Sequence, residues 1–255
     1  MIISRRDFVG LAGGAMAAGM IASSPFARAA EAKRITCVAF DAFPILDPRP
    51  IAALAEQIFP DNGRELVNQW RTRQFEYTWL RSVANRYVDF RQVTADSLTF
   101  AARALKVDLP DAKRQPLLDA YLKLQAYPDV LPALQSLRDA GYRLAFLSNF
   151  TVEMLQAGIR NSGLNGFFEH VLSTDAVKAF KPAPAAYRMA VDAFRVPQEE
   201  ILFVPFAGWD AAGAKWFGYK TFWANRQKFP PEELDATPDA VGENLTDLVT
   251  YLKSA

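Results

Sequence analysis

Short apolar segments that alternate with helical segments constrain this chain more than any other feature. From residue 129 onward, four such segments each follow a stretch whose apolar positions have helical spacing. A fifth, Ile-Thr-Cys-Val-Ala-Phe, comes earlier and ends at Asp41. Strands that alternate with helices form a parallel sheet covered on both faces. The sequence therefore predicts an α/β fold with a doubly wound parallel sheet.

The predicted strands are short and separated by helices. They occupy residues 34–41, 143–148, 170–173, 201–204 and 220–224. The helices of this region are predicted at residues 129–140, 151–161, 184–194, 208–217 and 245–252. Because the strands are parallel, their carboxyl ends meet at one edge, where open α/β sheets bind ligands.

Residues 50–127 interrupt the alternation and contain no convincing strand. The stretch 64–83 has no breaker and carries apolar residues at near-helical spacing, and helices are also predicted at 93–105 and 112–126. We therefore expect a core formed by residues 30–49 and 128–255, into which residues 50–127 are inserted as a helical cap. Three cap aromatics are expected to be core rather than pocket residues: Trp70, Tyr77 and Trp79.

The first 29 residues resemble a twin-arginine export signal. Arg5 and Arg6 precede a mildly apolar run that extends to about residue 22, and Ala27-Arg28-Ala29 fits a small-x-small cleavage site. An uncleaved anchor or a chance arginine pair is the alternative. We expect cleavage after Ala29, a periplasmic location and no stable membrane anchor in the mature protein.

The net charge, the single cysteine and the single histidine exclude several classes of function. The chain has a net charge of +1, and removal of residues 1–29 leaves about −1, so neither nucleic acid nor an anionic membrane is an expected partner. The single cysteine, Cys37, excludes an intramolecular disulfide and is expected to be a small buried residue. The single histidine, His170, is expected to be structural, so no histidine-based chemistry is proposed.

Polar side chains gather where the predicted strands end. Parallel strands bring a carboxylate, a hydroxyl, an ammonium and a second carboxylate into one crevice. A carboxylate becomes a usable nucleophile when a fixed cation keeps it charged and apolar walls exclude water. The segments concerned carry Asp41, Ser148-Asn149, Lys181-Pro182 and Trp209-Asp210.

These segments resemble the motifs of the haloacid dehalogenase superfamily, and within it the (S)-2-haloacid dehalogenases of type II. The resemblance covers about residues 34–254, and its most specific part is Trp-Arg-Thr-Arg-Gln-Phe-Glu-Tyr-Thr-Trp-Leu-Arg-Ser at 70–82. The other matching motifs are Phe40-Asp41-Ala42-Phe43, Leu147-Ser148-Asn149, Phe180-Lys181-Pro182 and Trp209-Asp210-Ala-Ala-Gly213-Ala.

The resemblance implies a HAD-like Rossmannoid core and the conversion of small (S)-2-haloacids to (R)-2-hydroxy acids without a cofactor. Asp41 would displace the halide and form an ester, which water then hydrolyses at the Asp41 carbonyl. Lys181 would keep Asp41 ionised, and Asp210 would fix Lys181 and orient water. The expected ligands are the haloacid and the halide, and the cap helices of the family often form a homodimer.

The resemblance also implies a substrate pocket. Ser148 and backbone N–H groups near Asn149 would hold the substrate carboxylate, and Arg71 together with Asn149 would receive the halide. Superfamily phosphatases carry an aspartate two residues after the nucleophile, where this chain has Phe43, so no metal is expected. The residues expected to line the pocket are Phe43, Phe75, Phe90 and Trp209.

The chain departs from the family at two motifs. Pro44-Ile45 stands in place of Gly-Thr, and Pro205 and Ala207 replace a serine and an asparagine. Ile45 cannot hydrogen-bond the nucleophile, and losing one donor costs about 10²–10³ in rate. Three hypotheses follow: a working dehalogenase, a hydrolase of another small acid, or an exported protein that binds a small acid or a partner without turnover.

Three of the candidate side chains could instead have ordinary structural roles. Asp41 could cap a helix, and Lys181 could be a solvated loop charge. Arg71 could form a surface ion pair with Glu76 or Glu65. The structure decides among these alternatives.

Overall fold

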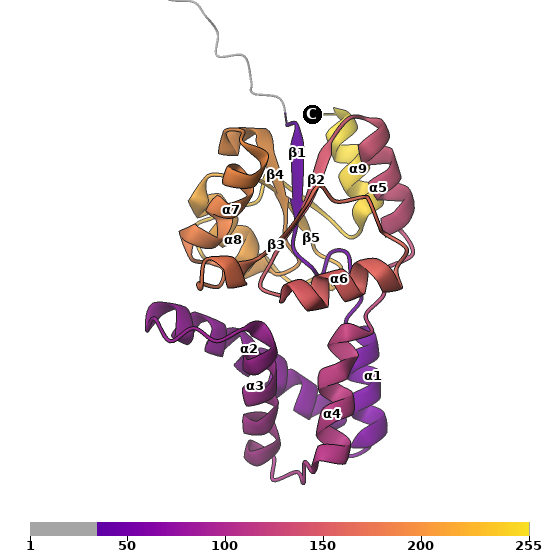
Figure 1. The fold of residues 1–255 in the computed structure, drawn as a ribbon, viewed down its shortest axis with the longest axis vertical. Coiled ribbons are helices and arrows are strands. Elements are labelled where there is room, and N and C mark those ends of the chain that lie inside the picture. The colour runs from indigo at the N-terminus through magenta and orange to yellow at the C-terminus, as the bar shows by residue number, and fades with distance from the viewer. Residues whose placement is uncertain (1–34, 255) are drawn as a thin grey trace, which may run out of the picture. The chain divides into compact units, whose positions relative to one another are not determined.

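The computed structural model describes residues 35–254, and the predicted export signal lies outside those residues. Within them, six parallel strands form one sheet in the order β3-β2-β1-β4-β5-β6 (Figure 1). The doubly wound parallel sheet is therefore confirmed. The strands are β1 (Cys37–Phe40), β2 (Arg143–Ser148), β3 (His170–Ser173), β4 (Ile201–Val204), β5 (Lys220–Ala224) and β6 (Ala240–Gly242).

The bounds of β2, β3, β4 and β5 agree with the predicted ones, whereas β1 is shorter and β6 was not predicted. Thr36 lies before β1 but extends its ladder, because its N–H donates to the carbonyl of Glu200 at 2.9 Å. The short β6 has no apolar run, and its central Val241 is 55% exposed. A strand of this kind leaves no alternation pattern to detect.

Helices cover both faces of the sheet (Figure 1). Val38 and Phe40 of β1 pack toward one face, and Cys37 and Ala39 pack toward the other. Burial on both sides accounts for the continuously apolar sequence of β1, and it confirms that Cys37 is a small core residue. The first face is covered by α5 (Val130–Asp139), α6 (Val152–Asn161) and α9 (Leu245–Ser254), and the second by α7 (Pro184–Phe194) and α8 (Gly208–Phe217).

Between β1 and α5 the described chain forms a helical insert (Figure 1). This insert consists of α1 (Arg49–Ile58), α2 (Gly63–Val83), α3 (Phe90–Ala104), α4 (Asp111–Asp119) and the 3₁₀ turn η1 (Ala120–Leu122). The predicted helix at 112–126 is wrong in its length, because Pro116 lacks an N–H and the chain tightens into η1 soon after it. No helix among residues 35–254 combines the length and apolarity that a bilayer span requires.

Aromatic side chains fill the interior of the insert. Trp70 is 2% exposed, and its indole N–H donates to the carbonyl of Thr94 at 2.8 Å. Trp70 is therefore a core residue, as predicted. Tyr77 is half-buried against Phe100, and Trp79 is half-buried against Trp209 at 5.4 Å between ring centroids.

The chain enters and leaves the insert through two paired linkers. Leu46 and Ala126 form an isolated antiparallel bridge. Two backbone hydrogen bonds flank it, from Asp47 to Gln125 at 2.8 Å and from Tyr127 to Ile45 at 3.0 Å. This pairing ties the insert to the loop that follows Asp41.

Candidate active site

Asp41 lies directly after β1, between the ends of β2 and β4. Its N–H donates to the carbonyl of Val204 at 3.1 Å, which continues the ladder by one residue. Residues 42–45 then form a turn, and α1 begins only at Arg49. The alternative that Asp41 caps a helix is therefore wrong, and its carboxylate lies at the edge where open α/β sheets bind ligands.

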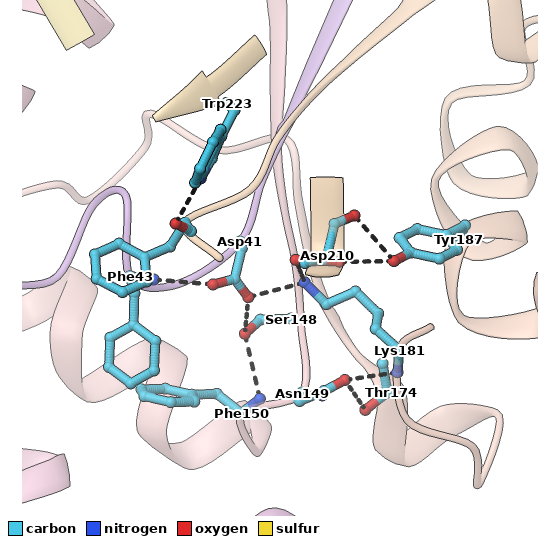
Figure 2. Close-up of polar contacts among 11 residues, drawn as sticks. Asp41, Phe43, Ser148, Asn149, Phe150, Thr174, Lys181, Tyr187, Asp210 and Trp223 are labelled. Atoms are coloured by element: carbon cyan, nitrogen blue, oxygen red, sulfur yellow. Dashed lines mark hydrogen bonds and ion pairs between the residues drawn. The ribbon is translucent and has the colours of Figure 1, made fainter. Parts of the chain in front are cut away.

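Three donors hold the carboxylate of Asp41 (Figure 2). Oδ1 accepts hydrogen bonds from Ser148 Oγ at 3.0 Å and from Lys181 Nζ at 2.9 Å. Oδ2 accepts one from the backbone N–H of Phe43 at 3.2 Å. The carboxylate is thus fixed in direction, with its two side-chain donors on the same oxygen.

Lys181 bridges two carboxylates. Its side chain is 1% exposed, and Nζ lies 2.9 Å from Asp41 and 2.6 Å from Asp210 (Figure 2). The alternative of a solvated loop charge is therefore wrong. Burial by itself would lower the pKa of Lys181, but Asp210 and Asp41 outweigh it and raise the pKa above its usual range. Lys181 is consequently a permanent cation beside the candidate nucleophile.

Asp210 is the second carboxylate of the site and lies in the first turn of α8. Oδ2 accepts a hydrogen bond from Lys181, and Oδ1 accepts one from Tyr187 Oη at 2.7 Å. Burial, and to a lesser extent the neighbouring Asp41, raise the pKa of Asp210, whereas Lys181 and Tyr187 lower it; burial dominates, and the pKa is raised to about 6. This carboxyl group therefore titrates close to neutral pH.

Ser148 and Asn149 support the two central charges from the end of β2. Ser148 Oγ donates to Asp41 and accepts a hydrogen bond from the N–H of Phe150 at 3.3 Å. Asn149 Oδ1 accepts one from the backbone N–H of Lys181 at 2.9 Å. The Nδ2 donor of Asn149 has no protein partner within residues 35–254, which leaves it available to an anion.

A small cavity lies over Asp41. It offers about 20 Å³ to the centre of a water-sized group. It brings together nine of the ten residues expected in the site, namely all except Arg71. Phe150, Phe206 and Ala207 also line it and were not expected there. The expected lining residues are Asp41, Phe43, Phe75, Phe90, Ser148, Asn149, Lys181, Trp209 and Asp210.

Arg71 lies outside this cavity and lines two adjoining ones. Its Nη1 donates to Gln227 Oε1 at 3.3 Å, and its guanidinium lies 5.3 Å from the centroid of the Phe206 ring. Burial lowers the pKa of Arg71, and no carboxylate among the described residues pairs with it. The alternative of a surface ion pair with Glu76 or Glu65 is therefore wrong, because the guanidinium lies against Phe206 and Gln227 instead.

Tyr187 was not predicted from the sequence as a site residue. It lies on the buried face of α7, and besides its bond to Asp210, its carbonyl accepts a hydrogen bond from Tyr219 Oη at 2.5 Å. A signal existed, because a hydroxyl on the apolar face of a helix needs a partner. That partner is 23 positions away along the chain, so the sequence did not reveal it.

The other titratable groups do not form a metal centre. Among residues 35–254, no group of three or more His, Cys, Asp or Glu side chains is placed to hold a metal ion. His170 is the first residue of β3 and lies 3.2 Å from Glu169 and against the ring of Phe194. These contacts suit the structural role expected of it.

The structure shows how the two motifs that differ from the family pattern are packed and hydrogen-bonded. Ile45 is fully buried and closes the turn after Asp41 by donating to the carbonyl of Ala42 at 3.1 Å. The Pro205 carbonyl accepts a hydrogen bond from Ala224 at 3.0 Å. Ala207 lines the cavity and occupies the N-cap of α8 without a side-chain hydrogen bond. This part of the wall therefore offers no side-chain donor to a ligand.

A family described as haloacid dehalogenase-like hydrolase matches residues 23–218. The chain belongs to this hydrolase family. Two curated members show how close the relationship is. The haloacetate dehalogenase H-2 of Moraxella sp. (strain B) is 40% identical over 208 residues, 81% of this chain and 93% of the relative. The (S)-2-haloacid dehalogenase of Pseudomonas sp. (strain YL) is 40% identical over 219 residues, 86% and 94% of the two chains.

A solved structure of the same family extends the comparison to the fold. The L-2-haloacid dehalogenase of Xanthobacter autotrophicus, determined with chloropropionic acid covalently bound, superposes with a TM-score of 0.78 at 31% identity. The match covers 86% of this chain and 98% of the other. This haloacid dehalogenase-like hydrolase therefore shares a whole-domain architecture with a dehalogenase that forms a covalent adduct.

Proposed function

We propose that this hydrolase converts small (S)-2-haloacids to (R)-2-hydroxy acids through an ester on Asp41. One observation carries the proposal: Lys181 Nζ lies between Asp41 and Asp210 beneath an aromatic cavity. A fixed ammonium keeps the nucleophile ionised where apolar walls remove its water. The named activities of its relatives are those of haloacid and haloacetate dehalogenases.

In the first step, Asp41 attacks C2 of the substrate. Oδ2 is the freer oxygen, because it accepts only the backbone N–H of Phe43, whereas Oδ1 carries two side-chain donors. A new C–O bond forms as the carbon–halogen bond breaks, and the halide leaves with the bonding pair. Attack opposite the leaving group inverts C2, which gives the (R) configuration in the product.

In the second step, water attacks the ester carbonyl carbon of Asp41. The carbonyl oxygen is then Oδ1, already within 2.9 Å of Lys181 Nζ and 3.0 Å of Ser148 Oγ. Donors at this distance stabilise the developing oxyanion. Asp210, whose pKa is raised to about 6, is the second carboxylate of the cavity and accepts the proton of the water. The bond between the carbonyl carbon and Oδ2 then breaks, and the proton passes to the departing oxygen, which releases the 2-hydroxy acid and restores the carboxylate of Asp41.

The departing halide needs a donor or a cation. Asn149 lines the cavity, and its Nδ2 has no partner among residues 35–254. The guanidinium of Arg71 packs on Phe206 and donates to Gln227. It can therefore reach the halide only after its hydrogen bond to Gln227 breaks. We therefore assign first contact with the halide to Asn149 and subsequent capture to Arg71, which stays cationic at any relevant pH.

The decisive experiment follows the fate of Asp41. Incubation with (S)-2-chloropropionate should release chloride and (R)-lactate in equal amounts. Multiple turnovers in ¹⁸O-water should introduce the label into Asp41, detected by peptide mass spectrometry, and the Asp41→Asn variant should release no chloride. Chloride release without label in Asp41 would contradict the ester mechanism.

The alternative of a binding protein has one observation in its favour, since neither Pro205 nor Ala207 supplies a donor to the hydrolytic water. Release of one equivalent of chloride with a stable adduct left on Asp41 would mean that the ester-hydrolysing step is lost. Saturable binding of the acid without any adduct would remove the enzymatic function altogether.

The location and assembly are proposals of the same kind. Export by the twin-arginine pathway predicts a mature N-terminus at Ala30 in the periplasmic fraction, and an Arg5→Lys, Arg6→Lys variant that stays in the cytoplasm. Residues 50–127 would act as the cap over Asp41. A homodimer formed through the cap helices predicts twice the monomer mass in light scattering.

A further inference from the structure

The small cavity over Asp41 shares a wall with a larger one. The larger cavity, measured in the same way, has about 370 Å³ and lies between α2 and the segments that follow β4 and β5. The shared residues are Phe75, Phe206, Ala207 and Trp209. Three of them are large aromatics, so the methyl group of Ala207 is the thinnest part of the wall.

The larger cavity is suited to an aromatic group. Besides the shared rings it is lined by Phe229, which is 54% exposed and has no ring partner among residues 35–254. Phe75 and Trp209 already make an edge-to-face contact at 5.3 Å, the arrangement that aromatic rings prefer. Its polar lining comes from Asn68, Arg71, Thr72 and Glu232. An apolar ring would therefore find aromatic neighbours and exclude water from Phe229.

Of the two neighbouring cavities formed by residues 35–254, the larger one offers a bulky substituent the open direction. The cavity over Asp41 has about 20 Å³, so a group larger than a methyl must extend beyond it. A third cavity, of about 110 Å³, touches it only through Phe43. Phe43 is held in edge-to-face contact with Phe150 at 5.1 Å and packs on Phe206 at 5.6 Å. That side is therefore closed, whereas the side at Ala207 has no large side chain to displace.

We infer that the larger cavity is a second substrate compartment, which takes the aryl or long alkyl substituent of bulky (S)-2-haloacids. The substituent passes over Ala207 while C2 stays beside Asp41. This inference rests on the proposed dehalogenase function, and it adds to it that the substrate range extends to acids such as (S)-2-chloro-3-phenylpropionate.

Two variants test the compartment. Asn68→Trp fills the larger cavity from an exposed position on α2 and does not touch the cavity over Asp41. Ala52→Phe is the matched control, because it enlarges a side chain in the third cavity instead. Chloride release from (S)-2-chloropropionate and (S)-2-chloro-3-phenylpropionate is measured for both variants and for the unaltered chain. Circular dichroism verifies that each variant is folded.

The unaltered chain should process both acids with kcat/KM values within about tenfold of each other. Asn68→Trp should lower kcat/KM for the phenyl substrate by about tenfold or more and leave that for chloropropionate within about twofold, and Ala52→Phe should change neither by more than that. Turnover of chloropropionate alone, or equal losses for both acids in Asn68→Trp, would overturn this inference and leave the proposed function intact. Chloride release from neither acid would overturn both.

Discussion

The guanidinium of Arg226 donates two hydrogen bonds to the backbone carbonyl of Pro44, from Nε at 3.0 Å and from Nη2 at 2.8 Å. Pro44 lies three residues after Asp41, in the turn that departs from the family motif. Arg226 also forms a bidentate pair with Asp129 and stacks on Tyr127 at 3.9 Å from the ring centroid. It therefore joins the nucleophile turn to the second linker.

Replacing Arg226 by Met should loosen this turn. We expect the free energy of unfolding to fall by about 3 kcal/mol, because a largely buried ion pair loses one partner. We also expect kcat to fall by about tenfold with little change in KM, because the Asp41 carboxylate is no longer held in the orientation required for attack. Urea denaturation and steady-state kinetics measure the two effects. Asp129→Asn is the control: it should cost stability but keep kcat, since the bonds to Pro44 remain.

Activity should fall on the acid side of about pH 6. Protonation of Asp210, whose pKa is raised to about 6, removes the negative charge that faces Lys181 and the acceptor for the proton of water. Because the folded pKa exceeds the unfolded value of about 3.9, the stability that this group contributes is present below pH 4 and is lost as the pH rises through 6. Protonation of Asp210 should therefore not unfold the protein, and the loss of activity at acid pH should have a chemical cause.

A pH profile of kcat/KM, with circular dichroism recorded at each pH, separates these effects. Asp210→Asn should be far less active and should lack the limb near pH 6. A limb that persists unchanged in this variant would assign the titration to another group.

Tyr187→Phe should shift the acid limb of the pH profile of kcat/KM. The hydrogen bond from Tyr187 to Asp210 lowers the pKa of that carboxyl, so its removal should shift the limb to higher pH. The control is Tyr219→Phe, which removes the bond to the Tyr187 carbonyl without touching Asp210. It should cost about 1 kcal/mol of stability and leave the limb in place. Equal shifts in both variants would refute a direct role for Tyr187.

Ala207→Asn should speed the hydrolysis of the ester and stabilise α8. The backbone of Ala207 has φ −95° and ψ 145°, the conformation of an N-cap, but no side chain caps the helix. An asparagine there should add about 1 kcal/mol and offer a donor to water in the cavity. Burst kinetics with (S)-2-chloropropionate should show a second step faster by up to about tenfold. Ala207→Leu, of similar size without polar atoms, should show neither gain.

Sequence patterns predicted the sheet well because its strands are buried on both faces. Continuous apolar runs such as Arg143–Ser148 and Ile201–Val204 are typical of buried parallel strands when helical segments lie between them. The exposed Ala240–Gly242 strand lacks that signature and was missed. Helix α1 was also missed as a separate element, although Ile51, Leu54, Ala55 and Ile58 recur at helical spacing in its sequence.

The candidate site was predictable where each residue follows a strand and less so elsewhere. Asp41 directly follows β1 and Ser148 is the last residue of β2, and the parallel topology brings Ser148 Oγ to 3.0 Å from Asp41 Oδ1. Tyr187 depends on the packing of α7 on α8, which no local pattern encodes. The position of the Arg71 guanidinium depends on its contacts with Phe206 and Gln227, which follow other strands, and spacing along a helix cannot specify those contacts.

The bridge between Leu46 and Ala126 makes the inserted segment a removable module. Its two ends emerge side by side, so a shorter or longer segment could replace it without altering the spacing of any strand in the sheet. Exchange of this segment would replace the cavity walls that Phe75 and Phe90 supply and leave β1 and Asp41 in place.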